Sequence, residues 1–350
     1  MLFRRSDAGA VVSAAQKTLR LRVGLNPYGL TYHLGLQGAG AARANPQGSG
    51  LEGFVAIAQE IGARTLEIFD PWLRALSDDE LARLRDRLAS LDMAPIISAG
   101  LTMGPFESAL RSARALGATT IRFGLTNVLC GDRHALGEKW PELVATVRAA
   151  LGEYGARAAD EGRVLAIENH QDFGSAELVD YCEAFRGVGV CFDTGNTFPV
   201  AEAPLDFARR IAPYVRHVHL KDYRVGFTDE GYRLVRCAIG DGAVPFPALI
   251  EMLAQHHTTM TAVLEPGALE ARHVRLLKPE WWSGYAPKAA PELAACLAAA
   301  RRHRLVDDAE WRTPWETGED GAIAAYELAM IRRSAANMRA IGIMQSEVNA

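Results

Sequence analysis

Short apolar runs alternate with longer stretches of helical periodicity along most of the chain. The runs are rich in β-branched and bulky residues, a composition that predicts strands. The stretches between them, such as residues 105–117, repeat apolar residues every three or four positions and often end in Gly, as helices do. The predicted strands cover residues 21–25, 65–69, 95–99, 119–123, 164–168, 188–193, 215–220 and 261–265.

Eight repeats of a strand followed by a helix predict a parallel sheet that closes on itself. We therefore expect an α/β protein that folds as a single (β/α)8 TIM barrel with insertions and a C-terminal extension. Three insertions are interpreted as loops that follow strands and so lie on the C-terminal face, where barrel enzymes keep their active sites: residues 29–53, 126–140 and 222–247.

A further insertion at about residues 272–315 contains four tryptophans, Trp281, Trp282, Trp311 and Trp315. It precedes a last helix that the pattern predicts over residues 321–341. We expect residues 1–20 to form an N-terminal extension and residues 21–345 to form the barrel.

Composition narrows the class of protein. A chain of 350 residues exceeds the roughly 250 that a barrel needs. Net charge is −4 without a basic cluster, which argues against a nucleic-acid partner. Five scattered cysteines without a C-x-x-C motif indicate reduced thiols and a cytoplasmic protein. The sequence shows no signal-peptide pattern and no apolar stretch long enough to span a membrane.

Four of the predicted strands end in a side chain that can bind a metal. These residues are Glu168, Asp193, His219 and Glu265. Taken singly, a carboxylate at a strand end has a plainer interpretation as a cap for the next helix. Together they predict one site, because parallel strands of a barrel end at the same mouth. Three crowded carboxylates repel one another and resist ionisation unless a cation neutralises them. Three carboxylates and one imidazole favour Mn²⁺, Mg²⁺ or Co²⁺ over a closed zinc site.

Other polar residues near the strand ends are weaker candidates for substrate binding, namely Glu67, His134, His170, Asn196 and Lys221. Lys221 either contacts a substrate oxygen or pairs with a carboxylate. Asn196 is either a substrate contact or a helix N-cap, and His134 is either an acid/base group or a surface residue. His217 lies one pleat deeper than His219, which favours a hydrogen-bonded core histidine over a ligand.

Several motifs resemble those of the sugar phosphate isomerase/epimerase superfamily, the xylose isomerase-like TIM barrels. They are Ile-Glu168-Asn-His170, Phe-Asp193-Thr-Gly-Asn196, His217-Val-His219-Leu-Lys221-Asp222, Gly240-Asp-Gly242 and Leu-Glu265-Pro266, within about residues 23–266. The resemblance implies that Glu168, Asp193, His219 and Glu265 bind the metal. It also implies that Glu168 and Glu265 act as base and acid on opposite faces of the substrate. Many members carry His where this chain has Asn196.

The superfamily includes tagatose epimerases, hydroxypyruvate isomerases, inosose dehydratases and endonuclease IV. This chain lacks the extra histidines of the nuclease. Its Gly-rich first loop and Trp-bearing insertion are similar to a branch that contains 3-keto-glycoside lyases and the large subunit of C-glycoside deglycosidases. The resemblance thus implies a keto-sugar isomerase or epimerase, or alternatively a lyase that cleaves 3-keto-glycosides by β-elimination. It also implies an oligomer, in the second case with a small partner subunit.

A second class of function is a non-catalytic role. The Trp-bearing insertion is also compatible with a subunit or binding module in which a metal serves structure alone. A stable heteromer that is active only when assembled would favour that interpretation.

Overall fold

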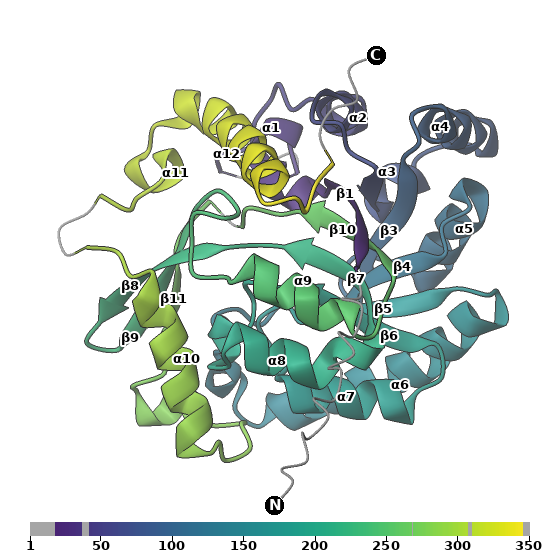
Figure 1. Ribbon diagram of the computed structural model, residues 1–350. Coiled ribbons are helices and arrows are strands. Elements are labelled where there is room, and N and C mark those ends of the chain that lie inside the picture. Colours follow the sequence, from purple (N-terminus) through teal and green to yellow (C-terminus); the bar gives the residue numbers. More distant parts are fainter. Residues whose placement is uncertain (1–17, 37–41, 268, 307–309, 346–350) are drawn as a thin grey trace, which may run out of the picture.

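The computed structural model describes residues 18–36, 42–267, 269–306 and 310–345. In this part of the chain, eight parallel strands form a closed barrel in the order β1-β10-β7-β6-β5-β4-β3-β2 (Figure 1). The barrel confirms the predicted (β/α)8 fold, and each predicted run overlaps one strand. The strands are β1 (Arg20–Leu25), β2 (Thr65–Phe69), β3 (Ala94–Gly100), β4 (Thr120–Gly124), β5 (Val164–Glu168), β6 (Val188–Asp193), β7 (Val215–Leu220) and β10 (Thr259–Leu264).

Helices surround the barrel and bury one face each against it. In α5, the residues Phe106, Ala109, Leu110, Ala113 and Leu116 are buried, and this spacing of three and four places them on one helical face. The helices that follow the strands include α2 (Gly50–Glu60), α4 (Asp78–Ser90), α5 (Phe106–Leu116), α6 (Lys139–Asp160), α7 (Ser175–Ala184), α8 (Pro204–Ile211), α9 (Phe246–Ala254) and α12 (Asp320–Ala340).

The last helix, α12, begins and ends within one residue of the helix predicted over residues 321–341. Its Glu327 is buried and accepts hydrogen bonds from His33 N (2.7 Å), Tyr32 N (3.1 Å) and Thr31 Oγ1 (3.2 Å). These bonds hold the short elements η1 (Pro27–Leu30) and α1 (Thr31–Leu34), which follow β1, close to the end of the barrel. The predicted N-terminal extension falls almost wholly on residues 1–17, which lie outside the described residues.

The interpretation of residues 222–247 as a loop was wrong. They contain a hairpin of β8 (Tyr223–Thr228) and β9 (Gly231–Arg236), and β11 (Arg272–Val274) completes an antiparallel sheet in the order β11-β9-β8. The alternation of buried Tyr223 and Val225 with polar neighbours was the signal for the hairpin. No local sequence pattern predicts β11, because this strand forms only by pairing with β9, which lies far away in the sequence.

The insertion after β10 contains β11, η5 (Pro279–Trp282), α10 (Ala290–Arg302) and α11 (Pro314–Thr317), which lie beside β8 and β9 on one side of the barrel (Figure 1). Its Trp281 is fully buried and donates a hydrogen bond to Cys130 O over 2.9 Å. Tyr285 Oη donates to Gly131 O, also over 2.9 Å. Gly131 has φ +68°, and a Cβ there would lie 2.5 Å from the Trp281 ring. The insertion thus fixes the loop that follows β4.

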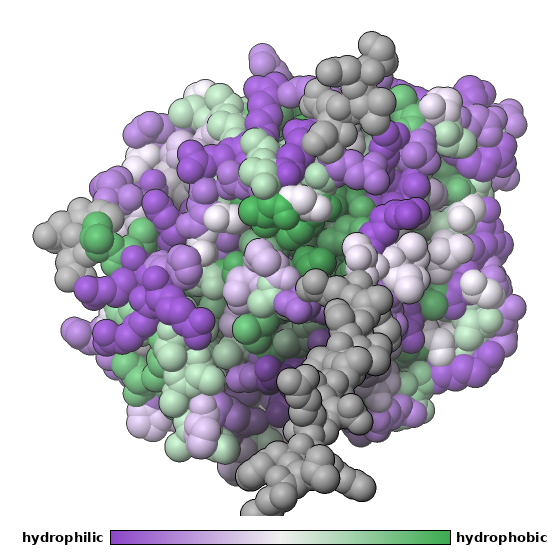
Figure 2. Space-filling model, viewed as in Figure 1, coloured by the Kyte–Doolittle hydropathy of each residue, from purple (hydrophilic) through white to green (hydrophobic). Residues whose placement is uncertain are grey.

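Hydrophilic residues are frequent on the face of the molecule shown in Figure 2. In Figure 2, hydrophilic residues cover much of the outer helices, and hydrophobic residues gather mostly near the middle of the face in view. Among the helices of the described segments, none combines the length and the hydropathy that crossing a membrane requires. The five cysteines, all within the described residues, are free thiols.

Candidate active site

Side chains from four neighbouring strands converge at the C-terminal mouth of the barrel. Glu168 and Asp193 are the last residues of β5 and β6. His219 lies near the end of β7, and Glu265 directly follows β10. One donor atom from each residue lies within 4.8 Å of the others, and all four residues are buried. The four strand ends therefore meet as the sequence predicted, because β5, β6, β7 and β10 are consecutive around the barrel.

Two buried cations balance part of the negative charge of this cluster. Lys221 Nζ lies 2.7 Å from Asp193 Oδ2 and also contacts Glu265. The guanidinium of Arg122, on the adjacent strand β4, donates to Glu168 Oε2. Charge-assisted hydrogen bonds of this kind are about twice as strong as neutral ones. They hold the carboxylates in fixed positions at the barrel mouth.

The surroundings favour different protonation states for the three carboxyls. Burial raises the pKa of Glu168, but the guanidinium and the imidazole beside it outweigh burial and hold this pKa well below its usual range. At Glu265, burial is likewise outweighed by Lys221 and His219, and the pKa is lowered. At Asp193, burial prevails and raises the pKa. The lowered pKa values of Glu168 and Glu265 favour the ionised form of both side chains.

His219 directs its Nδ1 at the carboxylates. Its Nδ1 lies 2.9 Å from Glu265 Oε2 and 3.4 Å from Glu168 Oε1. Within the described residues, Nδ1 of His219 and Oε1 of Glu168 are buried without a hydrogen-bond partner. Buried polar atoms nearly always have a partner, and a divalent cation would satisfy both of these. The donor set, rich in oxygen, fits a hard cation, and the cluster is a possible metal-binding site.

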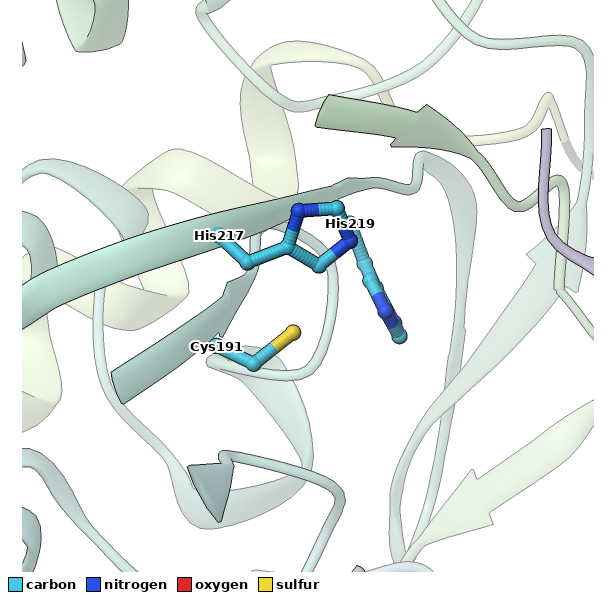
Figure 3. A group of neighbouring side chains, drawn as sticks. All are labelled: Cys191, His217 and His219. Carbon is cyan, nitrogen blue, oxygen red and sulfur yellow. The ribbon is translucent and has the colours of Figure 1, made fainter. Parts of the chain in front are cut away.

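A second group of potential ligands lies beneath this cluster and consists of Cys191, His217 and His219 (Figure 3). His217 Nδ1 lies 2.7 Å from Thr261 Oγ1, and its Nε2 lies 3.2 Å from Glu67 Oε2. Burial raises the pKa of the Cys191 thiol to about 12, so the thiol is neutral. Because both nitrogens of His217 have partners, this group is a hydrogen-bonded floor. The interpretation of His217 as a core histidine is confirmed.

A pocket of about 490 Å³ opens above the cluster. Its polar lining includes Arg122, His170, Lys221 and Glu265. Its aromatic lining consists of Tyr28, Phe69, Tyr223 and Trp315. Two of these residues lie in segments added to the minimal barrel, since Tyr28 is in η1 after β1 and Trp315 is in α11. A volume of this size is that of an ordinary small-molecule site.

Only some of the predicted substrate-binding residues line the pocket. His170 and Lys221 line the pocket, whereas Glu67 and Asn196 are buried outside its lining. Asn196 Nδ2 donates to Asp193 Oδ2 over 2.8 Å. The interpretation of Asn196 as an N-cap was wrong, because Thr197 and Ala203 cap the two helices that follow it.

His134 is not brought together with the other predicted residues. It lies in η2 (Arg133–Leu136), where its Nδ1 is 4.0 Å from Asp132 Oδ1. It is half-buried and does not line the pocket. The neighbouring Arg133 accounts for the shape of this loop, because it is 1% exposed and donates to Asp172 O (2.7 Å) and Gly284 O (2.8 Å).

Two residues of the site were not expected from the sequence. Arg122 is a charged residue inside an otherwise apolar strand, which is itself a signal of a buried polar site. Tyr28 reaches the pocket because Asn26 accepts a hydrogen bond from Tyr28 N and donates from Nδ2 to Glu265. No sequence pattern indicates this connection between the first and last strands.

Comparison with known proteins places the chain in a family. A family model described as the xylose isomerase-like TIM barrel matches residues 55–280, more than half of the chain. The chain belongs to the xylose isomerase-like TIM barrel family. This result supports the resemblance inferred from the motifs at superfamily level.

Curated relatives are similar over part of their length. The chain is 25% identical over 188 residues to the Escherichia coli K12 protein YihM, covering 51% of this chain and 53% of that protein. It is 26% identical over 148 residues to an inosose dehydratase of Clostridium botulinum strain Alaska E43, covering 38% of this chain and 48% of the enzyme. The chain thus spans about half the length of the curated relatives it matches.

Solved structures share the fold. A D-psicose 3-epimerase crystallised in the presence of D-fructose has a TM-score of 0.55 and 16% identity, covering 92% of this chain and 99% of that one. A xylose isomerase-like TIM barrel protein from Mycobacterium smegmatis in complex with magnesium has a TM-score of 0.52 and 18% identity, with 90% and 97% coverage. At these identities the likeness concerns the fold alone.

Proposed function

We propose that this protein is a divalent-metal-dependent carbohydrate enzyme that removes a proton next to a carbonyl group and acts as a keto-sugar isomerase or epimerase. The convergence of Glu168, Asp193, His219 and Glu265 beneath a polar pocket carries the proposal. The names of the psicose epimerase and the inosose dehydratase that resemble this chain support it.

The four converging residues would hold the ion. Mn²⁺ is the metal we propose, with Mg²⁺ or Co²⁺ as alternatives, because one imidazole among three carboxylates suits oxygen-preferring ions. The unpaired His219 Nδ1 and Glu168 Oε1 support this assignment. When bound, such an ion polarises a carbonyl oxygen of the substrate and so acidifies the adjacent C–H bond.

Glu168 and Glu265 perform the proton transfer in this proposal. They come from the outer two of the four strands and therefore flank the cluster. One carboxylate takes the proton from the carbon next to the carbonyl. Return of the proton to the opposite face of that carbon gives an epimer, and return to the former carbonyl carbon gives an isomer.

His170 and Lys221 bind the substrate in this proposal. Both line the pocket, and Lys221 already contacts two of the carboxylates. Burial lowers the pKa of His170 to about 4, so its imidazole is neutral at pH 7 and can both donate and accept a hydrogen bond. A sugar hydroxyl needs this kind of partner.

The second candidate function is a lyase that cleaves 3-keto-glycosides by β-elimination. The same carboxylate would remove the α-proton, and the substituent at the β-carbon would leave with its bonding electrons. Tyr28 and Trp315 favour this candidate, because these two aromatic side chains line the pocket beyond the cluster and could contact an aglycone. In this case we propose an oligomer that includes a small second subunit, in the cytoplasm.

Metal analysis followed by a substrate panel tests both candidates. The purified protein is chelated and assayed with free ketoses and with 3-keto-glycosides, before and after addition of Mn²⁺. We expect about one ion per chain and turnover that returns with Mn²⁺. Turnover of a ketose selects the isomerase, and release of an aglycone selects the lyase. A chain that binds no divalent ion and has no metal-restored activity would contradict the proposal and favour a binding module.

A further inference from the structure

Glu67 is a buried carboxylate outside the cluster of Glu168, Asp193, His219 and Glu265, and it contacts His219 of that cluster. Glu67 lies in β2, is fully buried, and does not line the pocket. Its Oε2 lies 2.6 Å from His219 Nε2 and 3.2 Å from His217 Nε2, within hydrogen-bond distance of both. In the barrel order, β1 and β10 stand between β2 and β7, so these bonds cross the barrel interior.

This contact determines which nitrogen of His219 carries a hydrogen. A carboxylate oxygen accepts, so Nε2 of His219 is the N–H that donates to Glu67. In a neutral imidazole the other nitrogen then has a free lone pair. That nitrogen is Nδ1, which lies 3.4 Å from Glu168 Oε1 and 2.9 Å from Glu265 Oε2. When Nδ1 carries no hydrogen, its lone pair is therefore directed at the carboxylates.

The same bonds decide between two possible ion sites. His219 belongs both to the carboxylate cluster and to the group with Cys191 and His217 (Figure 3). The planes of the two imidazole rings are nearly perpendicular, at 89°. Glu67 holds Nε2 of both rings, so neither Nε2 is available to an ion beside Cys191. The nitrogen of His219 that Glu67 does not contact, Nδ1, is the one that faces the carboxylates.

We propose that Glu67 is a positioning residue that fixes the ring and the tautomer of His219, so that Nδ1 serves the metal. The inference rests on the proposed metal-dependent function and assigns Glu67 a role in metal affinity instead of substrate contact. Residues that orient a metal-binding histidine in this way contribute about 10- to 100-fold to affinity or activity. The other oxygen of Glu67, Oε1, lies 3.9 Å from Arg122 Nε. Glu67 therefore lies between the two histidines and Arg122, which pairs with Glu168.

Calorimetric titration of Mn²⁺ into chelated protein tests the role. We compare the wild type with Glu67→Leu, Glu67→Gln and Thr65→Val. Thr65 is a matched control because it lies two residues earlier on β2, is buried, and hydrogen-bonds only to the backbone, at Arg22 O. Melting temperatures and kcat at saturating Mn²⁺ are recorded for each variant.

We expect Glu67→Leu to raise the dissociation constant for Mn²⁺ at least about 10-fold. Glu67→Gln should show a smaller increase, because its amide oxygen still accepts from Nε2. Saturating Mn²⁺ should restore much of kcat in both, since Glu67 does not touch the substrate. Thr65→Val should lower the melting temperature with an unchanged dissociation constant.

Two results would overturn the role in different ways. If the wild type binds Mn²⁺ and both Glu67 variants bind it equally well, Glu67 does not position His219 and the proposed function stands. If the wild type binds no divalent ion, the proposed function fails and the role of Glu67 fails with it. Should Glu67→Leu not fold, the comparison of Glu67→Gln with Thr65→Val decides in the same way.

Discussion

Lys221 Nζ lies 2.7 Å from Asp193 Oδ2. Asp193 is the last residue of β6, and Lys221 directly follows the adjacent strand β7, so both lie at the same barrel mouth. The ammonium also contacts Glu265, and Lys221 is 3% exposed. A positive charge of the protein is thus built into the cluster that we propose to bind a cation. A divalent ion at the proposed site would interact with the same carboxylates as Lys221, so mutation of Lys221 separates the two contributions.

Lys221→Met should destabilise the chelated protein strongly. Removal of one partner from a buried ion pair typically costs about 3–5 kcal/mol. Because Mn²⁺ supplies positive charge to the same carboxylates, its addition should raise the melting temperature of Lys221→Met more than that of the wild type. Scanning calorimetry with and without Mn²⁺ measures both increments. The exposed Lys139→Met is the control, and equal increments in the wild type and Lys221→Met would contradict the argument.

Glu168→Gln and Glu265→Gln should each abolish turnover while the protein stays folded. General-base catalysis contributes about 10²- to 10⁴-fold, so a fall in kcat of at least that size is expected. Steady-state kinetics at saturating Mn²⁺ with the substrate identified from the panel measures the loss. Glu251→Gln on the surface of α9 is the matched control and should keep wild-type kcat. Full activity in either active-site variant would remove that residue from the mechanism.

Asp172 should contribute a pH-dependent term to stability. Burial raises its pKa to about 7, against an unfolded value near 3.9. The folded protein therefore retains a proton that the unfolded chain has released, and stability falls as the pH rises from about 4 to 7. Each pKa unit corresponds to about 1.4 kcal/mol.

Asp172→Asn should remove that term, because the amide does not titrate and its oxygen can still accept the hydrogen bond from Phe173 N. Urea unfolding at pH 5 and at pH 7.5 gives the difference in unfolding free energy for each protein. The loss of stability between the two pH values should be smaller in the variant than in the wild type. A loss of equal size in both would show that Asp172 does not titrate in this range.

Trp281→Ala should destabilise the protein by about 3–5 kcal/mol, the usual cost of deleting a buried tryptophan. Trp281 stacks on Tyr285 with ring centroids 4.8 Å apart and holds Cys130 O through its indole N–H. The loop that follows β4 also carries Thr126 and Asn127, which line the pocket, so KM should rise as well. Chemical denaturation and steady-state kinetics measure the two effects.

A nearby substitution controls for the position in the insertion. Leu277 is 56% exposed, and Leu277→Ala should change the unfolding free energy little. If Trp281→Ala is no more destabilising than Leu277→Ala, the insertion does not fix the loop after β4.

The fold and the convergence of the four cluster residues could be predicted because both depend on local patterns. An apolar run followed by helical spacing is visible within about 30 residues, and its repetition implies the barrel. A ligand-type residue at each strand end, such as Glu168 or Asp193, then needs only the parallel arrangement to converge. The bounds of α12 were recovered for the same reason.

The hairpin, the pocket walls and the supporting bonds could not be predicted in this way. The pairing of β9 with β11 joins segments that are distant in the sequence, and so does the bond from Trp281 to Cys130. His134 was a candidate by its loop position, but it does not line the pocket. Arg122 and Tyr28 enter the site through contacts with strands other than their own.

The sequence by itself determined a (β/α)8 barrel with four potential metal ligands at its mouth, because periodicity and strand-end chemistry are local properties of the chain. Only the tertiary structure decided that Lys221 and Arg122 balance the carboxylates and that Glu67 holds His219 by Nε2. These relationships cross the barrel interior between residues as far apart as Glu67 and His219. Their distances depend on how all eight strands close, and no segment of the sequence contains that information.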